Sequence, residues 1–136
     1  MKDCIDMGGT ATLFTMNESH GMGALTGAMD GAAYGAPRGE MKDLGNGEFE
    51  LLMYHWFLHK DGSTIHTNDR EILRMDPKTD TFLMEVEYTV VESSGRFEGY
   101  RGTFRGRGWF RADSKDGTPT GHSIGSVRFE GKICRE

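Results

Sequence analysis

Three residues in the central part of the chain could manage protons together: Asp69, His55 and Tyr88. A carboxyl group enclosed by apolar residues has a raised pKa and can act as a general acid or base, and a nearby His or Tyr can share or relay its proton. Such a set suits proton abstraction, isomerisation, elimination or ring closure. Thr67 and Glu71 are expected as neighbours of Asp69. The competing interpretation is structural: Asp69 bonds to a turn amide or an arginine, and His55 is a satisfied core histidine.

Three histidines that lie close together in the sequence, His55, His59 and His66, raise the question of a metal site. His59 falls at an expected turn, and His66 has the opposite strand parity to Asp69. Metal-binding barrels need a tighter histidine cluster, so we expect neither a metal nor any other cofactor. The sequence shows no Ser-His-Asp or Cys-His arrangement, and its Gly-Arg-Gly-Trp run lacks the strand–loop–helix context of a phosphate loop.

The elements that must position these residues are β-strands, because no segment has helical periodicity over a sufficient length. Strands are expected at Gly9–Asn17, Gly21–Met29, Glu48–Leu58, Thr64–Met75, Thr81–Val91 and His122–Ile133. Asp30–Arg38 is expected to be a loop that could hold a short strand, and Gly39–Lys42 could begin another. Turns are expected at Asn17–His20, Leu44–Gly47, His59–Ser63, Asp76–Asp80 and Asp113–Pro119. Seven or eight strands with short turns predict an antiparallel meander that closes into a single β-barrel with a central lumen.

Period-two alternation assigns the faces of the strands. In Thr81–Val91 the even positions, which include Tyr88, are apolar, so the even face is the interior. In Glu48–Leu58 the odd face, with His55, is taken as interior because Glu48 and Glu50 lie on the other face. In Thr64–Met75 the apolar residues at both ends of the odd face favour it as interior, which turns Asp69 inward. Side chains expected to contact a substrate in the lumen are Phe49, Leu51, Met53, Phe57, Thr67, Glu71, Met84, Val86, Phe104 and Phe129.

The stretch Ser94–Arg111 combines glycines with aromatics and arginines. Its glycine load excludes a helix and favours a turn followed by a strongly bent strand. Parity turns its glycines inward and its arginines outward, since so many arginines cannot be buried without partners. We expect solvated pairing with Glu85 and Glu87 for the outward arginines Arg101, Arg105, Arg107 and Arg111. The alternative is a basic stripe with Trp109 that binds an anion or a nucleic acid.

Inward-facing glycines affect the lumen, because Gly106, Gly108 and Gly125 place no side chain in it. Either large side chains from opposite walls fill this space, or it remains a pocket. A barrel of eight strands has an interior of a size to hold one small ligand.

Length and composition limit the classes of function. The 136 residues suffice for one domain with a core, and the net charge of −5 weighs against nucleic acid or a membrane surface as a partner. No segment approaches the ~20 apolar residues of a membrane-spanning helix, and the first residues lack an apolar signal core, so we expect a cytoplasmic protein. Cys4 and Cys134 are therefore expected as reduced thiols, although a closed barrel could bring them together.

Thr67-Asn68-Asp69, followed by a turn, a strand and the run Ser94-Gly95-Arg96-Phe97-Glu98-Gly99-Tyr100-Arg101-Gly102-Thr103-Phe104, resembles the small barrels related to allene oxide cyclase. The resemblance spans Gly62–Trp109, and a serine replaces the first glycine of the family's run. It implies a calycin-like eight-stranded antiparallel barrel, often oligomeric, with an apolar lumen and with Phe97 plugging one end. Relatives include cyclases and isomerases that steer a substrate by shape, and dirigent-type proteins. The run does not carry the family's catalytic residues, so none is transferred.

The expected function is that of a cofactor-free isomerase, cyclase or lyase acting on a small apolar or amphipathic molecule in the lumen. Asp69, His55 and Tyr88 would manage its protons. A non-catalytic binding or carrier protein on the same barrel is the alternative. The strand at 48–58 is apolar on both sides, so its outer face with Tyr54 and Trp56 predicts a homo-oligomer interface or another interaction surface.

Overall fold

The computed structural model describes residues 2–15 and 20–136. Within these ranges the chain forms ten strands and one 3₁₀ turn and no α-helix. The strands are β1 (Asp3–Asp6), β2 (Gly9–Thr15), β3 (Gly21–Gly27), β4 (Gly31–Pro37), β5 (Lys42–Gly45), β6 (Glu48–His59), β7 (Thr64–Asp76), β8 (Thr81–Ser93), β9 (Thr103–Lys115) and β10 (Thr118–Arg135), and the 3₁₀ turn is η1 (Gly95–Phe97).

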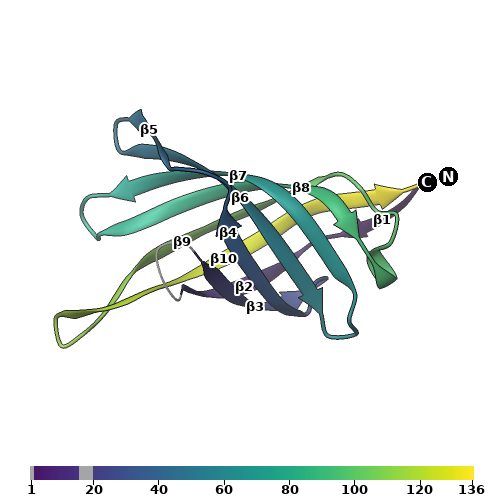
Figure 1. Ribbon diagram of the computed structural model, residues 1–136, viewed down its shortest axis with the longest axis horizontal. Helices are drawn as coiled ribbons and strands as arrows, with labels where there is room; N and C mark the ends of the chain where they lie inside the picture. The colour runs from purple at the N-terminus through teal and green to yellow at the C-terminus, as the bar shows by residue number, and fades with distance from the viewer. Residues whose placement is uncertain (1, 16–19) are drawn as a thin grey trace.

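The described strands form one closed antiparallel barrel of eight strands (Figure 1). Each strand of the series β2, β3, β4, β6, β7, β8, β9 and β10 pairs with the next, and β10 pairs back with β2. The two remaining strands lie outside this ring: β1 pairs with the end of β10, and β5 pairs with the start of β6. The expected all-β meander is therefore confirmed.

The largest error in the expected strands concerns Asp30–Arg38. This segment is no loop: β4 is a full barrel strand that pairs with β3 on one side and β6 on the other. Neither β1 nor the four-residue β5, which starts at Lys42, was expected in full. The end of the first expected strand at Asn17 and most of the turn at Asn17–His20 lie outside the described residues.

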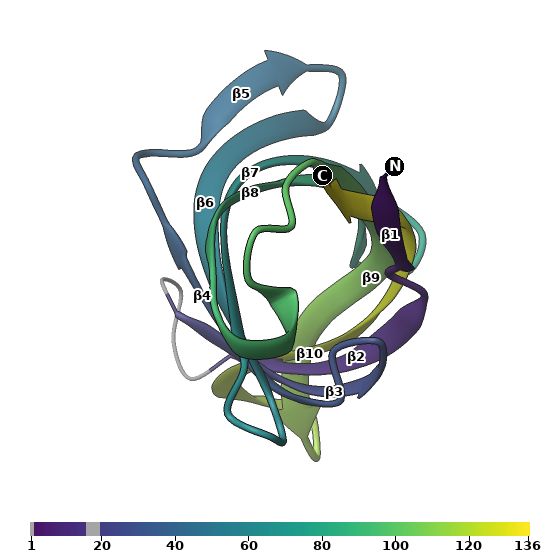
Figure 2. The same ribbon diagram turned by 90° about the vertical axis from the view of Figure 1, so that its right-hand side faces the viewer.

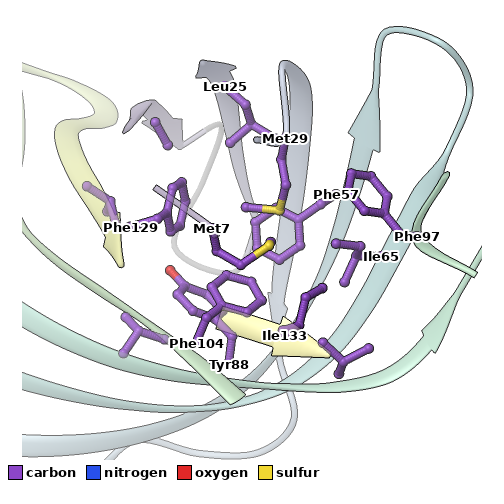
Figure 3. Packing of buried hydrophobic residues seen from close by; sticks show 14 of the residues in the cluster. Met7, Leu25, Met29, Phe57, Ile65, Tyr88, Phe97, Phe104, Phe129 and Ile133 are labelled. Carbon is purple, nitrogen blue, oxygen red and sulfur yellow. The ribbon is translucent and has the colours of Figure 1, made fainter. Parts of the chain in front are cut away.

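One half of the barrel interior is filled with apolar side chains. Figure 3 shows a cluster in which Phe57, Tyr88, Phe104 and Phe129 lie close together, with Phe97 and Ile133 toward one end. Aromatic ring centroids in this cluster are 4.8 to 6.2 Å apart, the separation of favourable aromatic pairs. The cluster also includes Met7, Leu25, Met29, Ile65 and Val90. These residues confirm the expected inward faces of the strands.

The connection between β8 and β9 closes the filled end (Figure 2). In η1, Phe97 is 1% exposed and its ring packs edge-on against His59 at 5.9 Å. The turn is fastened to the β6–β7 hairpin, because the Arg96 amide donates a hydrogen bond to Ser63 Oγ at 2.9 Å and the Arg96 side chain pairs with Asp61 at 2.8 Å. Phe97 plugs this end of the barrel, as expected.

The inward glycines do not create the pocket. A Cβ atom at Gly106 would lie 2.8 Å from Val127 Cγ1 and 3.0 Å from the Tyr88 hydroxyl, so large side chains already fill that space. A Cβ at Gly108 or Gly125 would overlap a backbone oxygen of the paired strand. These two glycines allow β9 and β10 to approach closely while they bend, which is a usual role of glycine within a barrel strand.

The arginines of β9 lie outside, as parity predicts. The register places Glu85 opposite Arg107 and Glu87 opposite Arg105. Among the described residues, the ion pair that β9 makes is the one between Arg107 and Glu130, at 3.9 Å, and both groups are exposed. Solvated cross-strand pairs of this kind contribute little to stability.

The expectation of reduced thiols is wrong: Cys4 of β1 and Cys134 of β10 form a disulfide. The same end of the molecule is held by Asp3, which accepts a hydrogen bond from the Tyr100 hydroxyl at 2.6 Å and pairs with Arg135 at 3.2 Å. The two chain ends consequently lie side by side at the filled end (Figure 2). In the part of the chain that the structure describes, no helix has the length and hydropathy to span a membrane.

Candidate functional site

The other half of the barrel contains a cavity of about 470 Å³. Its wall is mostly apolar, and every strand of the ring contributes residues to it. The exposed side chains of Met22 and Met41 also line it. The lining residues among those described are Leu13, His20, Gly21, Met22, Ala33, Gly35, Met41, Leu51, Met53, His55, Glu71, Leu73, Met84, Val86, Tyr88, Phe110, Ser123, Ile124 and Val127. A cavity of this size suits one small molecule.

A pair formed by His55 and Asp69 is the principal polar feature of the cavity wall. His55 Nδ1 lies 2.5 Å from Asp69 Oδ2, and the Asp69 side chain is fully buried while that of His55 is 18% exposed. The second carboxyl oxygen of Asp69 accepts a hydrogen bond from Thr67 Oγ1 at 2.6 Å. Both oxygens of the buried carboxyl group are thereby satisfied, and the imidazole is held in one orientation.

The β6–β7 hairpin sets this geometry. In its tight turn the His59 amide donates a hydrogen bond to the Ser63 carbonyl and the Gly62 amide donates one to the His59 carbonyl, and the resulting register places His55 opposite Thr67. Asp69 is then the diagonal neighbour of His55 on the same inward face, a relation that brings long side chains within reach. With Nδ1 donating its proton to the carboxylate, Nε2 keeps a lone pair, so the pair can accept a proton at Nε2.

The imidazole of His55 packs over Gly35 of β4. These two residues are directly opposite in the β4–β6 register, and a Cβ atom at position 35 would lie 2.6 Å from His55 Nε2. The ring also stacks on Phe57, with centroids 5.5 Å apart, and packs edge-on against Tyr88 at 5.4 Å. The position of the proton-accepting nitrogen therefore depends on the absence of a side chain at Gly35.

Glu71 contributes a second carboxyl group to the cavity. It is 7% exposed, and burial, together with the charge of Asp69, raises the pKa of this carboxyl to about 7, although His55 acts in the opposite direction. A carboxylic acid with a pKa near neutrality can both give and take a proton at neutral pH. Glu71 and the His55–Asp69 pair are thus two proton-exchanging groups on one wall.

Tyr88 completes the polar part of the site. It lies opposite Asp69 in the β7–β8 register, is 3% exposed and lines the cavity. Burial, with smaller contributions from Glu71 and Asp69, raises the pKa of its phenol well above the ordinary value. Tyr88 therefore stays protonated and can donate a hydrogen bond.

The structure distributes the expected substrate contacts between two places. Leu51, Met53, Glu71, Met84 and Val86 line the cavity. Three others, Phe57, Phe104 and Phe129, lie instead in the filled half, and Thr67 is buried behind the wall as a partner of Asp69. Phe49 packs edge-on against Phe82 at 6.3 Å beside the core rather than on the cavity.

Sequence reasoning missed the contribution of β3 and β4 to the site. Gly21, Ala33 and Gly35 line the cavity, and the His55 ring lies in the space that Gly35 leaves. The signal was present as a run of Gly and Ala in the segment that was assigned to a loop. His20 and Met41 were also missed, because both lie outside the regular strands.

The remaining histidines of this region do not join His55. His59 Nδ1 accepts a hydrogen bond from the Asp30 amide at 3.0 Å, and His66 stacks on Trp56 at 3.8 Å on the outer face. Among the described residues, no group of three His, Cys, Asp or Glu side chains is arranged to hold a metal ion.

No family model matches the sequence, and neither a curated protein nor a solved structure does. The relation to the barrels of the allene oxide cyclase type therefore stays a prediction that depends on the residues quoted for it. The functional argument has to be made from the cavity itself.

Proposed function

We propose that this protein is a cofactor-free enzyme that moves a proton on a small apolar or amphipathic molecule in the barrel lumen, as an isomerase, cyclase or lyase. The observation that carries the proposal is the position of His55, which links the buried carboxylate of Asp69 to the cavity. A histidine held in this way is an efficient general base.

The proposed reaction begins when His55 Nε2 removes a proton from a substrate carbon. The electron pair of the broken C–H bond forms a new double bond to a neighbouring carbonyl carbon, and the negative charge that develops on the carbonyl oxygen is stabilised by a hydrogen bond from Tyr88. Asp69 stabilises the imidazolium that results. Return of the proton to another carbon gives an isomer, and departure of a leaving group with its electron pair gives an elimination product.

A proton-abstraction probe tests this proposal without knowledge of the natural substrate. We expect the protein to open 5-nitrobenzisoxazole, which requires removal of one C–H proton by a base, about a hundredfold faster than its His55→Gln variant does. His66→Gln is the matched control, because this histidine lies on the outer face. Binding of the uncharged dye N-phenyl-1-naphthylamine should be the same in all three proteins.

A carrier function is the second candidate, and the apolar cavity favours it independently of the His55–Asp69 pair. If the protein and its His55→Gln variant bind the dye but open the probe equally fast, the catalytic proposal is wrong and the carrier function is supported.

Further expectations remain proposals. The calycin-like kinship is supported by the position of Phe97, which lies where the resemblance predicted it. Self-association through the outer face of β6 is supported by Trp56, which is 45% exposed, and by the neighbouring Tyr54. The disulfide between Cys4 and Cys134 weighs against a cytoplasmic location, because disulfides persist mainly in oxidising compartments.

A further inference from the structure

The cavity wall contains a mostly buried carboxyl group that has no hydrogen-bond partner among the described residues. Glu71 is more than nine-tenths buried and lines the cavity, and among the described residues none donates a hydrogen bond to its carboxyl oxygens. Its cross-strand neighbours are the apolar Leu51 and Val86. Because an enclosed polar group without a partner costs free energy, this carboxyl is a site where a bound molecule would be stabilised.

The charged groups around the cavity determine which charge the head group of a bound molecule should carry. Two carboxyl groups, Glu71 and Asp69, lie at this wall, and the imidazole of His55 is already hydrogen-bonded to Asp69. No lysine or arginine is present among the described residues that line the cavity. An anionic head group would meet like charge without a compensating cation, whereas a cationic one would pair with the free carboxyl.

The remaining lining residues indicate what the apolar body of the bound molecule should be like. Besides Glu71 and His55, the polar or aromatic lining residues are His20, Tyr88, Phe110 and Ser123, and the rest of the described lining is aliphatic or glycine. Four methionines contribute to it, which are Met22, Met41, Met53 and Met84. Thioether side chains adapt to apolar groups of different shape. The wall therefore combines one acidic point with an extended, adaptable apolar surface.

We propose that the lumen binds an amphipathic amine, with its protonated amino group paired to Glu71 and its apolar body along the methionine-lined wall. This inference rests on the proposed function, since it assigns the substrate class to the same cavity. Pairing at Glu71 would fix which end of the substrate enters first, and thereby which carbon reaches His55 Nε2.

Three probes with the same chain and different head groups test the inference: decylamine, decanol and decanoate, each below the concentration at which it forms micelles. Isothermal titration calorimetry of the whole protein at pH 8 should show decylamine binding at least tenfold more tightly than decanol, and decanoate most weakly. Glu71→Gln should remove the preference for the amine. Glu87→Gln, which changes an exposed carboxylate on the outer face of β8, should retain it.

The outcomes separate this inference from the function on which it rests. Decanoate binding as tightly as decylamine, or an unchanged amine preference in Glu71→Gln, would overturn the amine assignment while leaving a ligand-binding cavity. Failure of all three probes to bind would count against the cavity function itself, and the amine assignment would fall with it.

Discussion

The same strands build both halves of the barrel, but one half is filled with apolar side chains and the other contains a cavity. Along β6, Phe57 lies in the filled half, whereas Leu51 and Met53 line the cavity. The difference continues on β3 and β4, the next strands of the ring, where Leu25 fills one half while Gly21 and Gly35 place no side chain in the other. Small residues on β3 and β4 thus leave room for the cavity and for the His55 ring on its wall.

Two truncations on the same face of β6 measure this difference in stability. Phe57→Ala should lower the free energy of unfolding by about 3–5 kcal/mol, because Phe57 is 2% exposed and packs against three other aromatic rings. Met53→Ala should cost only about 1 kcal/mol, since this half-buried side chain already borders open space. Urea unfolding followed by circular dichroism measures both values. Equal losses would mean that the two halves are equally well packed.

Glu71→Gln measures how much the buried carboxyl group lowers the free energy of unfolding at each pH. The pKa of this carboxyl rises from 4.5 to about 7 on folding, so the folded state holds the proton more tightly and stability falls as pH rises between these values. The amide avoids this loss. We expect the variant and the parent to be equally stable below pH 4, and the variant to be more stable by on the order of 3 kcal/mol at pH 8.

The measurement for Glu71→Gln is a series of urea unfolding curves between pH 4 and pH 8. A constant difference across the series would show that the carboxyl titrates normally in the folded protein. The polar half of the barrel would then carry no penalty for its buried acid.

Gly35→Ala should impair the site at a moderate cost in stability. The added methyl group would meet His55 Nε2 at 2.6 Å, so the imidazole must move away from its present position. We expect a loss of about 1–3 kcal/mol and a roughly tenfold slower opening of 5-nitrobenzisoxazole. Gly39→Ala is the control, because a Cβ there meets nothing within 4 Å.

A normal rate in Gly35→Ala would contradict the assignment of His55 as the base. A loss of both rate and dye binding would instead show that the cavity as a whole had collapsed. The comparison of rate with dye binding therefore separates displacement of one ring from closure of the lumen.

Much of the fold follows from alternation in the sequence. In β8 polar and apolar residues alternate clearly, whereas in β7 the apolar residues at both ends of one face had to decide the choice; the inward positions of Tyr88 and Asp69 were both predicted correctly. Alternation gives no signal in β4, because this strand consists mostly of Gly, Ala and Pro, which have low strand propensity. This segment is a strand because β3 and β6 each need a hydrogen-bonding neighbour there, which is a property of the closed barrel and not of the segment.

The site could be predicted only in part. Strand alternation placed both His55 and Asp69 on the inward face, but their contact depends on the register of the hairpin, which could not be predicted from the sequence. The role of Gly35 required knowledge of which residue lies opposite it. The disulfide was missed because thiol oxidation depends on the compartment, although barrel closure does bring Cys4 and Cys134 together.

The double pairing of β10 has a consequence for synthesis of the protein on the ribosome. This last strand bonds to β9 along one edge and to β2 along the other, so the ring cannot close before Thr118–Arg135 has emerged from the exit tunnel. Until then the nascent sheet has two unpaired edges, of the kind that recruit other chains. The enclosed environment of Asp69 and Glu71 would form only once β10 has joined the sheet, and a chain that stops before β10 would present both acids on an open, hydrated sheet.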